Sequence, residues 1–293
     1  MHSNGTKTDV ALVRRLLAAQ FPAWAGLPLE PVDSHGTVNA VYRLGPDLAV
    51  RMPRVEGGSE DVATEHRWLP RLAPHVAVAV PLPVAEGRPG EGYPWSWSVC
   101  RWIDGDTPGP GTGSAEFAVD VAEFVLALRR LDTTGGPSAY RDEPLATRDT
   151  ATRNALEVLH GVVDTEASAA VWSDALRVPG PRGPVWVHGD LQPGNVLVAG
   201  GRLGGVIDFG CMGLADPAVD LIAAWYLLPH GARRVFRAKI FRTGTGADAA
   251  EWTRGRGWAL SIALMELAAY RTTNPVMAAT ARHVIEEILA DAH

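Results

Sequence analysis

The spacing of hydrophobic and polar positions divides the chain into a strand-rich first part and a helix-rich second part. Apolar side chains recur at helical spacing over residues 8–21, which predicts a helix. Short apolar runs separated by turn residues follow, and they predict a three-stranded antiparallel meander over residues 31–34, 38–44 and 48–52.

A second helix is expected over residues 60–69, because Ser59 can act as its N-cap and Pro70 can end it. Two further strand-like segments cover residues 76–84 and 95–103. Strands therefore dominate this first part of the chain.

The first part ends in the stretch that is densest in glycine and proline, residues 104–114. Beyond it the apolar spacing is mainly helical. The expected helices cover residues 115–131, 151–163 and 165–176, and then residues 217–291 with breaks near Pro229, Gly244 and Pro275. Between these two groups of helices, short strands are expected at residues 185–187, 196–198 and 205–207. The chain should thus form an N-terminal unit over residues 1–103 and a C-terminal unit over residues 104–293.

Composition limits the class of protein. The 293 residues are 46% hydrophobic and 20% charged, as in a globular protein, and the net charge of -6 argues against general nucleic-acid binding. No apolar stretch approaches the roughly 20 residues that span a bilayer, and the N-terminal segment lacks the apolar core of a signal peptide. Cys100 and Cys211 do not make a disulfide framework. We expect a cytoplasmic monomer or homodimer without nucleic-acid or membrane partners.

The strongest chemical signal is the segment VHGDLQPGNVLV at residues 187–198, followed by VIDFG at residues 206–210. Asp190 lies in a tight loop after one expected strand, Asn195 opens the next strand, and Asp208 ends a third. This order could bring the oxygens of Asn195 and Asp208 towards one point, with Asp190 beside them. Mg²⁺ takes oxygen ligands, and phosphoryl transfer needs such a metal together with a positioned nucleophile and charge stabilisation.

The two segments resemble the catalytic and metal-binding motifs of the protein-kinase-like fold. The form HGDLxPGN followed by IDFG resembles the aminoglycoside phosphotransferase family specifically. The resemblance covers nearly the whole chain and implies an α+β, two-lobed fold, with a small β-rich N-lobe and a larger helical C-lobe. It also implies that Asp190 is the catalytic base, that His188 braces the loop, and that Asn195 and Asp208 bind Mg²⁺.

Local turn formation is the alternative explanation of these residues, since Asp, Asn and Gly are common in turns. Two motifs in the right order, each at a strand end, favour the kinase-like interpretation. Asp216 and Asp220 match a motif that follows the IDFG segment in the family and has a mainly structural role there. Because Asp216 precedes Pro217, we expect it to cap a helix.

The loop that would cover the nucleotide phosphates is weakly marked. Ser34, His35, Gly36 and Thr37 lie between two expected strands, where kinases place that loop. The stretch holds a single glycine, so an ordinary hairpin turn is the alternative.

A cation for the donor phosphates is expected at the end of the third strand. The resemblance places a lysine at this position and its carboxylate partner at Glu65, but the chain has Arg51, and its two lysines are Lys7 and Lys239. Arginine can bind phosphate oxygens bidentately. The alternative is that Arg51 and Glu65 are unrelated surface residues.

The segment that contains Cys100 and Trp102 is the expected adenine-binding hinge, because a kinase-like fold uses the backbone there to bind adenine. The alternative is that these side chains only pack in the core. No spacing of histidine and cysteine suggests thiolate catalysis.

The distribution of charge bears on the acceptor. Residues 1–103 carry 10 basic and 10 acidic side chains, whereas residues 104–293 carry 17 basic and 23 acidic ones. An acidic cleft would concentrate a cationic amino-sugar, while a solvated acidic surface is the alternative. Candidate acidic contributors are Glu157, Asp164, Glu166, Glu251 and Glu266.

The predicted function is the ATP-dependent transfer of the γ-phosphate to a hydroxyl of an aminoglycoside-like antibiotic, with Mg²⁺ as cofactor and GTP left open as the donor. One alternative is a kinase of another small alcohol, such as a macrolide, choline, homoserine or a sugar metabolite. Another is a non-catalytic nucleotide-binding scaffold, against which the intact Asp190, Asn195 and Asp208 argue. A protein kinase is disfavoured, because no Ala-Pro-Glu follows the short interval between Asp208 and Pro217.

Overall fold

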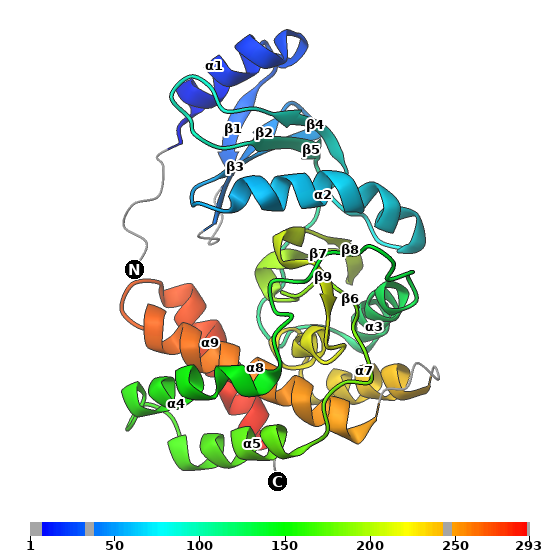
Figure 1. Ribbon diagram of the computed structural model, residues 1–293, viewed down its shortest axis with the longest axis vertical. Coiled ribbons are helices and arrows are strands. Elements are labelled where there is room, and N and C mark those ends of the chain that lie inside the picture. The colour runs from blue at the N-terminus through cyan, green and yellow to red at the C-terminus, as the bar shows by residue number, and fades with distance from the viewer. Residues whose placement is uncertain (1–7, 33–37, 243–247, 292–293) are drawn as a thin grey trace. The chain divides into compact units, whose positions relative to one another are not determined.

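The computed structural model describes residues 8–32, 38–242 and 248–291, and its contacts divide the chain into two units (Figure 1). The N-terminal unit comprises residues 1–105 and 205–210, and the C-terminal unit comprises residues 106–204 and 211–293. The short segment that carries Asp208 therefore packs with the N-terminal unit, although a contiguous division was expected. The assignment of nucleotide binding to residues 1–103 and of catalysis to residues 104–293 stays a prediction.

The N-terminal unit is built on a five-stranded antiparallel sheet in the order β1-β2-β3-β5-β4. Its strands are β1 (Leu29–Val32), β2 (Asn39–Leu44), β3 (Leu48–Pro53), β4 (Pro83–Gly87) and β5 (Trp97–Arg101). The predicted meander is confirmed in β1 to β3. β4 begins later than expected, at Pro83, because a proline cannot donate to a ladder and is tolerated at the start of an edge strand.

Side chains of β3 alternate between the two faces of this sheet. Val50 and Met52 belong to the apolar core that the sheet forms with α1 (Val10–Gln20). Arg51 points to the other face and contacts Glu65 of α2 (Gly58–Leu72). The two helices thus cover opposite faces of the sheet, and the register of β3 places Arg51 under α2.

α2 differs from the helix expected over residues 60–69. It begins earlier, after Gly57 with φ +92°, and it continues through Pro70. Ser59 does not cap it, because its hydroxyl accepts a hydrogen bond from the backbone N–H of Ser96 at 2.9 Å. Pro70 forfeits one helical hydrogen bond, but the apolar side chains of the last turn remain buried and stabilise it.

Helices dominate the C-terminal unit, as the apolar spacing predicted. They are α3 (Ala115–Arg129), α4 (Asp149–Val158), α5 (Thr165–Arg177), α6 (Ala223–Tyr226), α7 (His230–Arg242), α8 (Ala249–Tyr270) and α9 (Pro275–Ala290). α8 packs against α4, α5 and α9 and is buried on most sides between Gly255 and Leu264 (Figure 1). A helix that is buried all round forms the centre of its unit. No helix in the described ranges is long and apolar enough to cross a membrane.

Two short strand pairs follow in the second half of the chain. β6 (Val185–Val187) pairs with β9 (Gly213–Ala215), and β7 (Val196–Ala199) pairs with β8 (Arg202–Val206). The expected strands at 185–187, 196–198 and 205–207 correspond to β6, β7 and β8. β9 was missed, because three residues that include a glycine carry too little alternation to predict a strand.

Candidate active site

The loop between β6 and β7 is held by a buried carboxylate. Asp220 accepts hydrogen bonds from the backbone N–H groups of His188 and Gly189, both at 2.8 Å. Burial raises the pKa of Asp220, while the charge of His188 and the two N–H groups oppose that rise. Gly189 has φ +86°, and a Cβ there would lie 2.6 Å from the carbonyl oxygen of Cys211. This turn therefore requires glycine, and it sets the direction of the next residue, Asp190.

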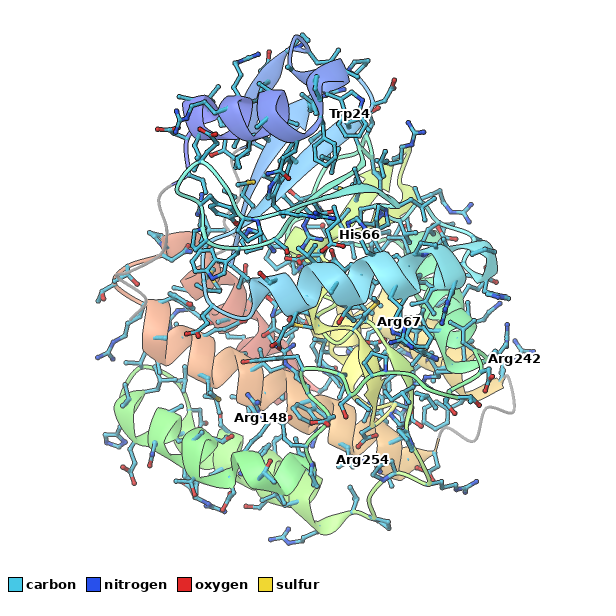
Figure 2. The ribbon with its side chains drawn as sticks, turned by 45° about the horizontal axis from the view of Figure 1, so that its top comes forward. Trp24, His66, Arg67, Arg148, Arg242 and Arg254 are labelled. Carbon is cyan, nitrogen blue, oxygen red and sulfur yellow. The ribbon has the colours of Figure 1, made fainter. Side chains whose placement is uncertain are left out.

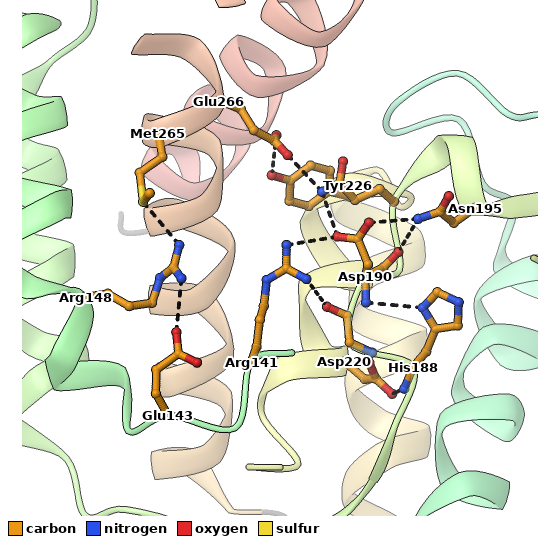
Figure 3. Close-up of polar contacts among 12 residues, drawn as sticks. Arg141, Glu143, Arg148, His188, Asp190, Asn195, Asp220, Tyr226, Met265 and Glu266 are labelled. Carbon is orange, nitrogen blue, oxygen red and sulfur yellow. Dashed lines mark hydrogen bonds and ion pairs between the residues drawn. The ribbon is translucent and has the colours of Figure 1, made fainter. Parts of the chain in front are cut away.

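Asp190 projects from this loop into a network of polar side chains (Figure 3). Its Oδ1 lies 3.2 Å from Nη2 of Arg141 and accepts a hydrogen bond from Nε2 of Gln192 at 3.1 Å. Its Oδ2 accepts one from Nδ2 of Asn195 at 2.9 Å. The backbone N–H of Asp190 donates to Nδ1 of the buried His188 at 3.2 Å. These contacts fix the orientation of the carboxylate, and His188 contacts the loop that it was predicted to brace.

Asn195 keeps one oxygen free for a cation. Its Nδ2 donates both to the backbone carbonyl of Asp190 at 2.8 Å and to the Asp190 carboxylate. Its Oδ1 accepts no hydrogen bond from any residue in the described ranges. An amide oxygen held in this way suits Mg²⁺, which prefers oxygen ligands.

Three residues of this network were missed from the sequence: Arg141, Gln192 and Tyr226. Arg141 comes from the segment between α3 and α4, and it also donates to the backbone carbonyl of Gly189 at 2.5 Å. No sequence motif marks Arg141 or Tyr226. Gln192 lies inside the HGDLQPGN segment, so its position beside Asp190 was a signal that could have been used.

Glu266 of α8 joins the same network. It accepts hydrogen bonds from Nε2 of Gln192 at 2.9 Å and from the hydroxyl of Tyr226 at 3.0 Å. Burial raises the pKa of Glu266 to about 7; the bond from Gln192 opposes the rise, and the charge of Asp190 adds to it. A single Gln192 amide therefore links the Asp190 carboxylate to a carboxyl group that titrates near neutrality.

The remaining acidic candidates lie outside this network. Glu251 pairs with Arg129 at 2.8 Å, and Asp164 caps α5 through the N–H of Ala167. Glu157 and Glu166 are exposed on α4 and α5. Of the five candidates, structural support for an acidic acceptor site therefore rests on Glu266.

Replacing Glu266 with glutamine should change how stability depends on pH. Because the folded state raises the pKa of Glu266 above its ordinary value, protonation favours the folded protein, and this stabilisation is lost as the pH rises from about 4.5 to about 7. One pKa unit corresponds to about 1.4 kcal/mol. Between pH 5 and pH 8, the free energy of unfolding of Glu266→Gln should therefore rise by about 1–3 kcal/mol relative to that of the wild type. Urea unfolding at both pH values measures this gain.

The exposed Glu286 of α9 provides the matched control, since Glu286→Gln removes the same charge without touching the Asp190 network. Its unfolding free energy should follow that of the wild type between the two pH values. If Glu266→Gln also does so, Glu266 is not the group that titrates near neutrality.

In the N-terminal unit, Arg51 joins two carboxylates. Its Nη1 lies 2.6 and 2.5 Å from the two oxygens of Glu65, and its Nη2 lies 2.8 Å from Oδ1 of Asp208. Burial lowers the pKa of Arg51, but the negative charges of Glu65 and Asp208 outweigh this effect and raise it above its ordinary value. The expected ion pair between Arg51 and Glu65 is present. The role of Arg51 towards a donor phosphate stays a prediction.

Asp208 adopts a backbone conformation that is uncommon outside glycine, with φ +60°. Its side chain is 42% exposed, and Arg51 engages only Oδ1. Asp61, one helical turn before Glu65, has its pKa raised to about 6 by burial and by the charges of Glu65 and Asp208. In the described ranges, no three His, Cys, Asp or Glu side chains form a metal-binding group. The binding of Mg²⁺ by Asp208 and Asn195 stays a prediction.

The predicted nucleotide-binding residues of the hinge are occupied by protein contacts. Cys100 is buried in β5, and burial raises the pKa of its thiol to about 11. The backbone N–H of Trp102 donates to the carbonyl of Asp47 at 2.9 Å, and its indole donates to Asp104 at 2.8 Å. Adenine binding by this segment stays a prediction, and the N–H of Trp102 is already engaged.

The predicted phosphate loop, Ser34, His35, Gly36 and Thr37, lies outside the described residues.

Asp216 has a different structural role from the expected one. Its carboxylate accepts the N–H of Ala218 at 2.9 Å and pairs at 2.7 Å with Arg254. Figure 2 labels Arg254 on α8. The turn that follows is a short 3-10 helix, Val219–Ile222, whose N-cap is Ala218. The expectation that Asp216 caps a helix is therefore wrong. The oxygens of Asp216 are engaged by Arg254 and by the N–H of Ala218, which precedes the helix.

A strand-rich unit with a buried Arg–Glu pair and a helical unit with an Asp-bearing loop define a protein-kinase-like fold. The chain is similar to the GDP complex of wild-type aminoglycoside 2'-phosphotransferase-IIIa over 98% of this chain and 100% of that one, with a TM-score of 0.72 and 20% identity. It is similar to macrolide 2'-phosphotransferase MphH from Brachybacterium faecium over 94% and 98%, with a TM-score of 0.61 and 22% identity. It is also similar to ADP-bound aminoglycoside phosphotransferase APH(2'')-Ib over 96% and 98%, with a TM-score of 0.60 and 15% identity. The predicted α+β, kinase-like fold is confirmed.

The chain matches the phosphotransferase enzyme family over residues 30–258 and belongs to that family. No curated protein matches it at the level of sequence. The family resemblance and the prediction that the protein is a phosphotransferase are confirmed.

Proposed function

We propose that the protein transfers the γ-phosphate of a nucleoside triphosphate to a hydroxyl of a small molecule. The observation that carries this proposal is the Asp190 carboxylate, which Arg141, Gln192 and Asn195 hold in one orientation at the end of a loop fixed by Asp220. A carboxylate held in this way can orient an acceptor hydroxyl and accept its proton late in the transfer. A non-catalytic scaffold gives no reason for such positioning.

The proposed roles of the side chains around the donor phosphates follow from the resemblance to kinases. Asp208 and Asn195 would hold Mg²⁺, which neutralises charge on the phosphates when it is bound. Arg51, held by Glu65, would contact phosphate oxygens through its guanidinium group. Arginine is suited to this role because its N–H donors match the geometry of phosphate.

The proposed donor is ATP, with GTP as the second candidate. One similar structure is an ADP-bound enzyme and another is a GDP complex, which supports both nucleotides without choosing between them. Competition between ATP and GTP in the transfer reaction separates the two.

The proposed acceptor is an aminoglycoside-like antibiotic. Glu266 beside Asp190 supplies a carboxylate that can attract a cationic amino-sugar, and residues 104–293 carry the whole net negative charge of the chain. Similar structures include aminoglycoside phosphotransferases. A macrolide is the second candidate, and the similarity to a macrolide 2'-phosphotransferase favours it.

A panel of acceptors tests this proposal. Aminoglycosides, macrolides and small alcohols are incubated with ATP or GTP and Mg²⁺, and each acceptor is analysed for the mass of one added phosphoryl group. Modification of an aminoglycoside by the wild type, and its loss in Asp190→Asn, is the expected result. Modification of macrolides alone would show that the acceptor is a macrolide and not an aminoglycoside. If no member of the panel is modified, the proposed transfer to these acceptors is rejected. A cytoplasmic location and a monomeric or dimeric state stay predictions.

Replacing Arg51 with alanine should weaken the binding of the donor nucleotide. The loss of charge-assisted hydrogen bonds to phosphate, each about 1.5–3 kcal/mol, should raise the KM for ATP by about 10–100-fold. Arg51→Lys should retain most of the activity, because it keeps a charge beside Glu65. Steady-state kinetics with varied ATP at a saturating acceptor concentration measure the effect.

The control for this change is Arg15→Ala, which removes an exposed arginine of α1 away from the predicted donor-binding residues. Arg51→Ala also leaves the buried Glu65 without its partner, so a thermal melt must show a folded protein before the kinetics are interpreted. An unchanged KM for ATP in folded Arg51→Ala would contradict the proposed phosphate contact.

A further inference from the structure

A cavity in the C-terminal unit has an unusual excess of positive charge. Its volume is about 510 Å³, and its walls include Arg233, Arg234 and Arg237 of α7, Trp252 and Arg256 of α8, and Asp291 after α9. None of these residues belongs to the Asp190 network. The cavity is therefore a separate feature of the molecule, which phosphoryl transfer does not explain.

One of its arginines has a structural role. The buried Arg233 pairs with Asp291 at 2.5 Å and also with Glu287, and it donates to the backbone carbonyl of Ala224 at 2.9 Å. These two carboxylates compensate its charge. Arg233 therefore joins α7 to the end of α9 and leaves the cavity to the other arginines.

The other three arginines differ from Arg233. Arg234, Arg237 and Arg256 form no ion pair or hydrogen bond with any residue of the ranges 8–32, 38–242 and 248–291. Asp291, the carboxylate in the cavity wall, is engaged by Arg233 and by the indole N–H of Trp225. α7 itself contains no acidic residue. Three guanidinium groups without an ion-pair partner in the described part of the chain therefore border one cavity.

Two of the three arginines are also restrained. The guanidinium of Arg237 lies over the ring of Trp252 at 5.1 Å, which holds it at the cavity wall. The Nε of Arg256 is buried and has no hydrogen-bond partner in the described part of the chain. Burial lowers the pKa of Arg256, and the charges of Asp174 and Asp291 oppose this. The rest of the Arg256 guanidinium borders the cavity, so its charge faces the same space as those of Arg234 and Arg237.

We propose that this cavity binds the phosphate group of a small anionic molecule. Arginine pairs bidentately with phosphate oxygens, and these three arginines match a group that carries about two negative charges. A volume of about 510 Å³ lies within the usual range for small-molecule sites, so it accommodates a phosphate together with the group that bears it.

Pyrophosphate is the probe, and its binding is followed by calorimetry and by hydrogen–deuterium exchange of the full chain. Pyrophosphate should protect peptides of α7 and of the first turns of α8. The variant Arg234→Gln/Arg237→Gln should bind at least tenfold more weakly at this site and should lose that protection. Both side chains are exposed, so the variant should melt at nearly the wild-type temperature.

The matched control is Arg130→Gln/Arg242→Gln, which removes the same charge from exposed positions of the same unit that do not line the cavity. It should bind pyrophosphate as the wild type does. Equal weakening in both double variants, or pyrophosphate binding without protection of α7, would overturn the proposal. Protection by citrate but not by pyrophosphate would reject phosphate as the ligand class. Because protection of α7 reads this cavity directly, the outcome does not depend on whether transfer activity is found.

Discussion

Replacing Asp208 with asparagine should lower kcat by on the order of 10³-fold, because the variant loses the carboxylate expected to bind Mg²⁺. The electrostatic contribution of a catalytic metal is several kcal/mol, and each 1.36 kcal/mol corresponds to a factor of ten in rate. Asparagine is the informative substitution here. It tolerates the left-handed backbone of residue 208 better than alanine does, and its amide oxygen can still accept the hydrogen bond from Arg51.

Turnover measured over a range of Mg²⁺ concentrations tests this prediction, with a thermal melt as the folding control. Higher Mg²⁺ should restore part of the rate, because the asparagine oxygen remains a weak ligand. The exposed Glu30 of β1 in the same unit supplies the control, and Glu30→Gln should behave as the wild type. Undiminished turnover of Asp208→Asn at ordinary Mg²⁺ would remove Asp208 from the proposed site.

The local pattern of the sequence was sufficient for most of the fold. The meander of β1 to β3 and the helices α7, α8 and α9 lie where alternation, helical spacing and breaks at Pro229 and Pro275 predicted them. These signals are local: each depends on a short window in which one face is apolar and turn residues mark the ends.

The failures have non-local causes. α2 continues through Pro70 because tertiary burial of its last turn outweighs one lost hydrogen bond. β9 exists because β6 supplies its partner, and a pattern of three residues is too short to predict such a pairing. The segment that carries Asp208 joins the N-terminal unit through pairing of Gly205 with Ala79, a contact that nothing within either segment predicts.

The candidate site likewise contains residues that local motifs predict and residues that only tertiary packing brings together. Motifs located Asp190, Asn195 and Asp208, and the position of Arg51 at the end of a strand located its pairing with Glu65. Arg141 and Tyr226 were beyond prediction, because each contacts the network from a distant segment and neither belongs to a motif. A sequence can thus supply the candidate reacting groups, while the side chains that hold them in place follow from the packed structure.

Replacing Asp190 with asparagine should lower kcat by on the order of 10²–10⁴-fold, the range expected for a positioned acid or base. The amide keeps the size of the carboxylate and can still accept a hydrogen bond from Arg141, so the loop held by Asp220 should keep its shape. The amide cannot accept the proton of an acceptor hydroxyl. Because the transition state of phosphoryl transfer is loose, that proton moves late, and the lost function is mainly orientation and final deprotonation.

The affinity for the donor nucleotide distinguishes this chemical role from a structural one. Calorimetry should give Asp190→Asn nearly the wild-type affinity for ATP with Mg²⁺, while turnover on the acceptor identified by the panel falls. Asp132→Asn, which changes an exposed carboxylate of the same unit, should alter neither quantity. Near-normal turnover of Asp190→Asn would remove the proposed base. Lost nucleotide affinity would instead mean that Asp190 maintains the structure of the loop, since Arg141, Gln192 and Asn195 all contact its carboxylate.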